Sequence, residues 1–319
     1  MQFGSTTMNP NYDLVTIQNN ILQIKEMLQQ LILYPRRDLA KWAKITKQTS
    51  NVKIGYLGQY LASLVSGIEG TRTGARGHDL RDHSEVKSCS RIDQLDKCKD
   101  CNAAVARMES KCPECLSSNI ERKRDSKWLF TVRSENELMT LLNEVPRILF
   151  ILSDYPNYDE KDWNTLQFQV FEIWPQNQRH RNFRTLMKNY YENIYLSHIE
   201  RNPQKTPAPK NFWPYKFQFY MCNPIRTFHC IVKEALSNPK IDVKEYVEPL
   251  TDREGVQPIP MPLSKLNEEE KLTIRNIIGR DAYELAEQRG LTMEQRFHLQ
   301  LRDTDHPRPQ QELYHRGQR

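Results

Sequence analysis

The 319-residue sequence predicts an α/β protein: a mixed central sheet flanked by helices, with a small four-cysteine ribbon inserted into the chain. Three observations lead to this prediction. They are a short alternating Asp/Glu/Lys stretch at 76–89, a continuous apolar run at 147–153, and two Cys-x2-Cys pairs at 98–115. Amphipathic helices precede and separate these stretches, and this order is typical of one α/β core that carries an insertion.

Composition restricts the class of protein. The mean hydropathy is −0.75, 27% of the residues are charged, and no apolar run is long enough to cross a bilayer. The first 20 residues are polar and lack the hydrophobic segment of a secretion signal. A net charge of +6 and a pI near 8.8 are consistent with a nucleic-acid partner. We therefore expect a cytoplasmic protein with no membrane segment.

Three helices are predicted ahead of the first strand, in an N-terminal helical region that we assign to residues 1–70. Apolar residues recur every three or four positions over 12–33, and Pro35 lies just beyond the end of this helix. A second helix at 37–49 carries a basic face, and a third follows at 56–68.

The stretch that follows reads as a β-hairpin with strands near 76–80 and 84–89. In this pairing Asp79 lies across from Glu85, and the period of two places both carboxylates and Lys87 on one face. Cross-strand neighbours are about 5 Å apart at Cβ, so two carboxylates can bind one Mg²⁺ with a lysine beside it. Such a cation activates water and stabilises charge on phosphorus. The alternative is an exposed hairpin with ordinary charges.

The motifs Gly-His-Asp-Leu at 77–80 and Glu-Val-Lys-Ser at 85–88 resemble the active site of the PD-(D/E)XK nucleases. Within these, the resemblance is to type II restriction endonucleases, and to the MamI-like group among them. It covers roughly residues 55–175, and its motifs are short. By this resemblance the fold is a restriction-endonuclease-like core.

The resemblance also implies roles for individual residues. Asp79 and Glu85 would bind Mg²⁺, the carbonyl of Val86 would add a ligand, and Lys87 would be the catalytic lysine. A histidine stands where the family pattern has a proline, which leaves Asp82 as a competing first ligand. Its spacing of three residues from Glu85 puts Asp82 in the turn, so we prefer Asp79.

The implied activity is Mg²⁺-dependent, sequence-specific hydrolysis of double-stranded DNA by a type II restriction endonuclease, leaving 5′-phosphate ends. A double-strand cut uses two sites related by a dyad, so a homodimer is expected. A cognate DNA methyltransferase in the same prokaryotic cell would be the genetic partner. Two alternatives stay open: a structure-specific repair or junction nuclease on the same core, and a non-enzymatic zinc-ribbon DNA-binding protein.

Charged residues next to the predicted hairpin are further candidates for the site. Glu69 ends the third helix and could add an acidic group, although charged helix ends are commonplace. The Gly- and Arg-rich link 70–76 holds Arg72 and Arg76, which we expect to contact a DNA phosphate near the metal.

The second feature is a pair of Cys-x2-Cys motifs, made by Cys98, Cys101, Cys112 and Cys115. Four thiolates at this spacing predict a tetrahedral Zn²⁺ site. A redox role is possible for one such motif, but two copies this close favour a structural metal. The ribbon spans about 96–117 and is inserted into a nuclease core that we assign to 71–175.

Further core elements follow the ribbon. A strand is predicted at 128–132, and then a helix capped by Ser134, with Glu137 completing a capping box. The apolar run at 147–153 is typical of a strand buried on both faces, and another strand is predicted at 166–174.

Residues 176–319 are assigned to a C-terminal region for DNA recognition and dimerisation. A helix at 177–200 interleaves basic and aromatic residues. Two strands flanking an Asn-Pro turn predict a hairpin at 215–233, and two helices are predicted at 264–301.

Overall fold

A five-stranded mixed sheet forms the centre of the protein in the computed structural model, which describes residues 7–46, 48–50, 56–72 and 78–305. The strand order is β1-β6-β7-β9-β10, with β1 and β6 parallel and the other neighbours antiparallel. The strands are Glu85–Ser90 (β1), Ile148–Asp154 (β6), Leu166–Ile173 (β7), Ile225–Lys233 (β9) and Lys240–Tyr246 (β10). The predicted mixed α/β architecture is confirmed.

The apolar run at 147–153 becomes β6, and all seven residues of this strand are buried. It lies between β1 and β7, so both its edges are hydrogen-bonded and both its faces are covered. The two outer strands, β1 and β10, are less buried than β6, and their polar side chains reach solvent. Strand β1 is therefore an edge strand, and one of its sides is free of ladder bonds.

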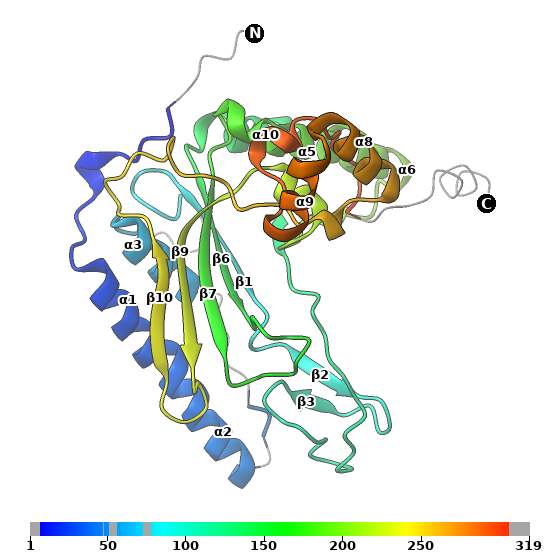
Figure 1. Cartoon of the computed structure of the whole chain (residues 1–319). Coiled ribbons are helices and arrows are strands. Elements are labelled where there is room, and N and C mark those ends of the chain that lie inside the picture. Colours follow the sequence, from blue (N-terminus) through cyan, green and yellow to red (C-terminus); the bar gives the residue numbers. More distant parts are fainter. Residues whose placement is uncertain (1–6, 47, 51–55, 73–77, 306–319) are drawn as a thin grey trace.

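Helices cover both faces of the sheet (Figure 1). On one face, Asn20–Leu28 (α1) and Leu57–Ser66 (α3) bury apolar side chains against β1, β6 and β7. On the other face lie Glu135–Met139 (α4), Arg181–Asn189 (α5) and Phe217–Met221 (α7). The C-terminal helices gather at one end of the sheet, and the ribbon lies at the opposite end.

The predicted helix end before Pro35 is wrong. Helix α1 continues through a π-helical turn, Gln29–Leu33 (η2), into Tyr34–Thr46 (α2). A proline inside a helix removes one hydrogen bond and clashes with the carbonyl four residues earlier, here that of Leu31. The widened π turn contains that residue, which explains how the helix accommodates the proline.

The predicted hairpin at 215–233 is also wrong. Phe217–Met221 forms helix α7, while β9 pairs with β7 and β10 instead. All five residues of α7 are buried, and a short, mainly apolar segment is compatible with either a buried strand or a buried helix. The backbone has a positive φ on each side of this helix, at Tyr215 (60°) before it and at Asn223 (54°) after it.

The remaining helices form the C-terminal bundle. The helix predicted at 177–200 is present as a run of 3-10, α and π segments: Gln178–His180 (η4), α5, Tyr190–Tyr195 (η5) and Leu196–Arg201 (α6). The two helices predicted at 264–301 are three, Glu268–Ile278 (α8), Arg280–Arg289 (α9) and Met293–Arg296 (α10). The additional break falls at Gly279, whose φ of 81° ends α8.

Two small sheets complete the fold. The ribbon strands Leu95–Cys98 (β2), Ala104–Ala106 (β3) and Ile120–Glu121 (β4) pair in the order β3-β2-β4, and Trp128–Phe130 (β5) pairs with Lys210–Phe212 (β8). Ser134 caps α4 by accepting from the backbone of Glu137, but the Glu137 carboxylate bonds to Arg133, so the predicted box is only half formed. No helix in the described ranges is long and apolar enough to cross a membrane.

Candidate active site

Where it is described, the first strand of the predicted hairpin is not a strand. Of residues 76–80 the structure describes 78–80, which make only an isolated bridge at Leu80. The reason lies in the Asp79 side chain, whose Oδ2 accepts a hydrogen bond from the backbone N–H of Val86 at 2.7 Å. A side chain therefore takes the place that a neighbouring backbone would occupy.

The backbone of β1 explains why this bond forms. The N–H of Glu85 donates to the carbonyl of Arg147 beside β6, at 3.1 Å. Successive residues of a strand point their backbone groups to opposite sides, so the N–H and C=O of Val86 point to the free edge. The Val86 carbonyl thus opens toward the same side as the Asp79 carboxylate.

The three side chains singled out from the sequence converge here. Glu85 and Lys87 form an ion pair, with 25% and 26% of their side chains exposed. The ammonium of Lys87 lies 5.7 Å from the ring centroid of Phe130. Gln59 of α3 donates to Asp79 Oδ1 at 2.6 Å and fixes the carboxylate from behind.

Burial raises the pKa of Asp79, and the nearby charge of Glu85 raises it further. The hydrogen bond from Val86, the charge of Lys87 and the bond from Gln59 all act in the opposite direction. The charge of Glu85 disfavours the ionised form of Asp79, and a bound cation would relieve this. The donor set fits a hard divalent ion, because two carboxylates and a backbone carbonyl supply the oxygen ligands that such an ion prefers.

The competing candidate, Asp82, is engaged elsewhere. Its Oδ2 accepts from the guanidinium of Arg147 at 2.9 Å, and its Oδ1 accepts from the backbone of Ser84 at 3.1 Å. Arg147 is fully buried and also donates to Ser84 Oγ at 2.9 Å and to Glu172 at 3.3 Å. Glu172 in turn pairs with the buried Arg253 at 3.3 Å. The turn before β1 is thus held by a buried network of two arginines and two carboxylates.

Sequence reasoning missed Gln59 and Arg147. Nothing in the helical pattern around Gln59 distinguishes it from a solvent-facing residue. Arg147 stands directly before the buried run of β6, and a charged residue there reads as the exposed end of a strand. Its burial depends on Asp82 and Glu172, which are distant in the chain.

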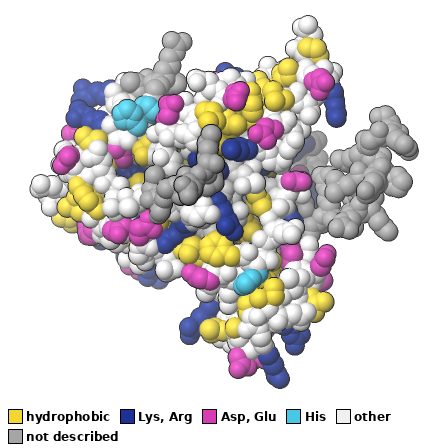
Figure 2. Space-filling model, turned by 90° about the horizontal axis from the view of Figure 1, so that it is seen from above, with side chains coloured by type: hydrophobic (Ala, Val, Ile, Leu, Met, Phe, Trp, Pro, Cys, Tyr) yellow, Lys and Arg dark blue, Asp and Glu magenta, His cyan; other side chains and the backbone are white. Residues whose placement is uncertain are grey.

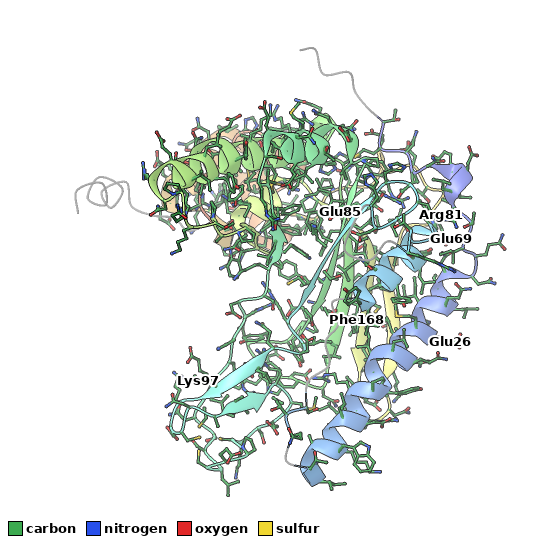
Figure 3. All side chains as sticks on the ribbon, turned by 180° about the vertical axis from the view of Figure 1, so that it is seen from behind. Glu26, Glu69, Arg81, Glu85, Lys97 and Phe168 are labelled. Carbon is green, nitrogen blue, oxygen red and sulfur yellow. The ribbon has the colours of Figure 1, made fainter. Side chains whose placement is uncertain are left out.

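Glu69 lies beyond the start of β1 and makes an ion pair with Arg81 at 3.0 Å. Figure 3 shows this pair beside Glu85, whereas Lys97 lies on the ribbon at the other end of the molecule. Both partners of the pair are about half exposed. Glu69 therefore already has a counter-charge.

Of the two arginines in the 70–76 link, the structure describes Arg72. Arg72 is exposed, and the N–H of the preceding Thr71 donates to the Asp79 carbonyl at 3.1 Å, which keeps this part of the link near the site. Arg76 lies outside the described residues.

The four cysteines of the ribbon are brought together, and all their sulfur atoms lie within 4.8 Å of one another. The Cys98–Cys115 and Cys101–Cys112 sulfur distances are 3.6 and 3.5 Å. Four ligands at about 2.3 Å from a tetrahedral Zn²⁺ would be about 3.8 Å apart, so the cluster fits this ion.

The two Cys-x2-Cys motifs have the same backbone conformation. In each, the residue after the second cysteine, Asn102 or Leu116, has a positive φ of about 60°. The N–H of that residue donates at 3.0 Å to the carbonyl of the first cysteine of its motif. Each knuckle is therefore a local structure set by a few adjacent residues.

Charged and aromatic side chains dock the ribbon on the core. Asp96 is buried and accepts from Arg107 and Arg122 at 2.7 Å each. Both guanidiniums lie 5.3 Å from the ring centroid of Trp163, in the loop between β6 and β7. Arg107 also lies over Tyr158 at 5.4 Å.

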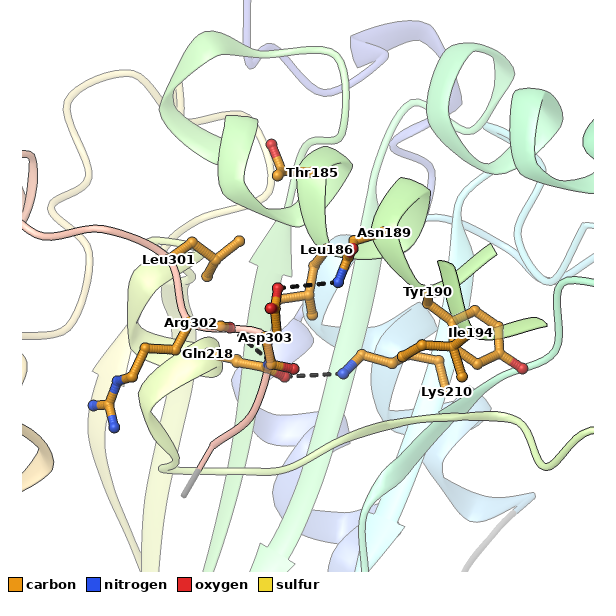
Figure 4. Close-up of a pocket in the computed structure, with 10 residues that line it drawn as sticks. All are labelled: Thr185, Leu186, Asn189, Tyr190, Ile194, Lys210, Gln218, Leu301, Arg302 and Asp303. Carbon is orange, nitrogen blue, oxygen red and sulfur yellow. Dashed lines mark hydrogen bonds between the residues drawn. The ribbon is translucent and has the colours of Figure 1, made fainter. Parts of the chain in front are cut away.

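A cavity of about 140 Å³ lies in the C-terminal bundle, away from β1 (Figure 4). Its polar groups bond to one another: Lys210 to Gln218 at 2.9 Å, and Asn189 to Asp303 at 3.2 Å. Because these polar groups already hydrogen-bond to one another, they are not available to bind a ligand.

The edge strand thus carries the groups that a metal-dependent nuclease needs, on a mixed α/β sheet. The chain belongs to the MamI restriction endonuclease family, whose family model matches residues 41–264, more than half of the chain. It is 32% identical over 83 residues to the type II restriction enzyme MamI of Microbacterium ammoniaphilum. That alignment covers 26% of this chain and 27% of that enzyme. No solved structure matches the chain.

Proposed function

We propose that the chain is a type II restriction endonuclease that hydrolyses double-stranded DNA with Mg²⁺, on a PD-(D/E)XK core. The convergence of Asp79, Glu85 and Lys87 at the free edge of β1 carries this proposal. Membership of the family supports it. The core would span 71–175 with the ribbon inserted, between the N-terminal helices and a C-terminal region for recognition and dimerisation.

In this mechanism Asp79, Glu85 and the Val86 carbonyl hold the cation. When bound, Mg²⁺ would lower the pKa of its water and stabilise charge on the phosphate. Lys87 hydrogen-bonds and orients the attacking water. The attacking water releases a proton to solvent as its oxygen bonds to phosphorus. The bond to the 3′ oxygen breaks in line, and this oxygen takes up a proton from solvent, so the products carry 5′-phosphate and 3′-hydroxyl ends. Arg72 and Arg76 contact the flanking phosphates.

The assembly is a homodimer, because two dyad-related sites are needed for a double-strand cut. The four cysteines hold a structural Zn²⁺. The enzyme would act in the cytoplasm of a prokaryotic cell that also makes a cognate DNA methyltransferase.

The test is cleavage of unmethylated phage genomic DNA with Mg²⁺, comparing wild type with Asp79→Ala and Lys87→Ala. We expect discrete fragments from wild type and a loss of at least about 100-fold in rate for each variant. Asp242→Ala, an exposed carboxylate on β10 at the far edge of the sheet, is the control and should cut normally.

Other outcomes separate the alternatives. A smear that both variants lose would point to a structure-specific nuclease on the same site. Binding without Mg²⁺-dependent cleavage by wild type would point to a zinc-stabilised DNA-binding protein and overturn the catalytic proposal.

A further inference from the structure

Figure 2 shows acidic and basic side chains interspersed over the face seen from above. Three lysines lie close together in the fold: Lys127, Lys216 and Lys265. Within the described ranges their ammonium groups form no ion pair and no side-chain hydrogen bond. They come from three separate parts of the chain, so their proximity is a product of the fold.

Lys127 and the turn after β8 lie together. Lys127 directly precedes β5, which pairs with β8. Its ammonium lies 4.6 Å from the ring centroid of Trp213, the residue after β8. The carbonyl of Trp213 accepts from the backbone N–H of Lys216 at 3.4 Å, so a tight turn places the second lysine close by.

Arg302 joins the third lysine to the same turn. Its guanidinium donates to the Lys265 carbonyl at 2.8 Å and lies 3.5 Å from the ring centroid of Phe217. Arg302 therefore bridges the backbone of Lys265 and the residue that follows Lys216. Burial lowers the pKa of Lys265, and the charges of Lys216 and Arg124 lower it further.

Arg124 adds to the excess of positive charge. It contacts Asp154 at 3.4 Å, but Asp154 is also the partner of the buried Arg91 at 3.4 Å. One carboxylate between two guanidiniums leaves a net positive charge. Cations held together in excess of their counter-charges repel one another, and a polyanion would reduce this repulsion.

We infer that Lys127, Lys216 and Lys265, together with Arg124, form a strip that binds the phosphates of DNA flanking the cut. We call these four residues the β5–β8 strip. This inference rests on the proposed function and extends it to a second contact surface, distinct from the arginines of the 70–76 link.

The position of the strip sets the distance to the cut. Strand β5 runs from the neighbour of Lys127 to Phe130, whose ring lies 5.7 Å from the ammonium of Lys87. Three residues of extended chain span about 10 Å. The strip therefore lies near the cut and contacts the DNA backbone within a few nucleotides of the scissile phosphate.

The test measures the salt dependence of binding to a mixed-sequence duplex of about 30 base pairs, with Ca²⁺ in place of Mg²⁺ to prevent cleavage. The strip variant is Lys127→Gln, Lys216→Gln and Lys265→Gln. The control carries Lys233→Gln, Lys240→Gln and Lys244→Gln on β9 and β10, the same change in charge at the opposite edge of the sheet.

We expect the slope of log K against log salt to fall by about 0.9 for each phosphate that the protein no longer neutralises, and so by about 2 to 3 in the strip variant. The control should keep the wild-type slope. Replacing the same three lysines by arginine should restore it, and the fragment pattern in Mg²⁺ should not change.

Two failures are distinguishable. If wild type binds and cuts DNA but the strip variant keeps the wild-type slope, the strip is wrong and the proposed function stands. If wild type neither binds nor cuts, the proposed function itself fails. Lys216→Gln alone, at an exposed position, should lower the slope by about 0.9 and covers the case in which the triple variant does not fold.

Discussion

The ribbon and the free edge of β1 both gather side chains of the kinds that bind metal ions, but they do so in different ways. In the ribbon, each pair of cysteines is positioned by a knuckle of a few residues, and the four sulfurs come together within 18 positions of the chain. At the edge of β1, Asp79 and Glu85 are near in sequence, yet their arrangement depends on Arg147, Glu172 and Gln59 from three other elements.

The difference has a physical origin. A ribbon this small buries few apolar side chains, so we expect its own structure to depend on a metal. The carboxylate site instead rests on a large sheet, whose packing stabilises the turn before β1 whether or not a cation is present. Loss of metal should therefore unfold the first region and leave the second intact.

The largest effect is expected from removal of zinc. Cys112→Ser, or chelation, should abolish one bound zinc per chain and unfold the ribbon locally, because structural zinc contributes on the order of 10 kcal/mol. Hydrogen exchange should show reduced protection in β2–β4 and retained protection in β6 and β7. Ser110→Ala, an exposed change in the same ribbon, is the control. Full protection of the ribbon without zinc would show that the ribbon folds without a metal and would contradict this prediction.

A smaller effect is expected from Arg147→Met. It leaves Asp82 buried without a counter-charge and Glu172 with Arg253 alone, and should lower the free energy of unfolding by about 3–5 kcal/mol. The matched control is Arg280→Met, whose ion pair with Glu284 is exposed and should cost at most about 0.5 kcal/mol.

Denaturant unfolding of both proteins measures this difference. Adding Asp82→Asn to Arg147→Met should recover part of the stability, since one unpaired charge is removed. Equal costs for Arg147→Met and Arg280→Met would show that the buried network does not hold the turn.

The smallest effect concerns the contact behind β1. A Cβ added at Gly58 of α3 would overlap Ser88 Oγ and lie 2.9 Å from its Cβ. Gly58→Ala should therefore cost about 1–3 kcal/mol by overpacking.

The second change Ser88→Gly tests this explanation. It removes the overlapping side chain, so the double variant should be more stable than the sum of the single changes predicts, while zinc content stays constant. Additive costs would mean that this contact does not position β1.

The sequence by itself determined the features that depend on neighbours in the chain. The Cys-x2-Cys spacing predicted the sulfur cluster, and the run at 147–153 predicted a strand with both faces covered. The Glu-x-Lys alternation correctly placed Glu85 and Lys87 on one strand. These patterns are local, because a strand or a knuckle has its period and its turn chemistry within a few residues.

Only the tertiary structure decided the rest. Asp79 reaches β1 through its side chain rather than as a paired strand, because β6 takes one side of β1 and leaves the Val86 N–H free on the other. The buried partner of Asp82 comes from residue 147, and the apolar run at 217–221 is a helix because of the core around it. Each of these outcomes depends on groups far apart in the chain, whose distances no local pattern encodes.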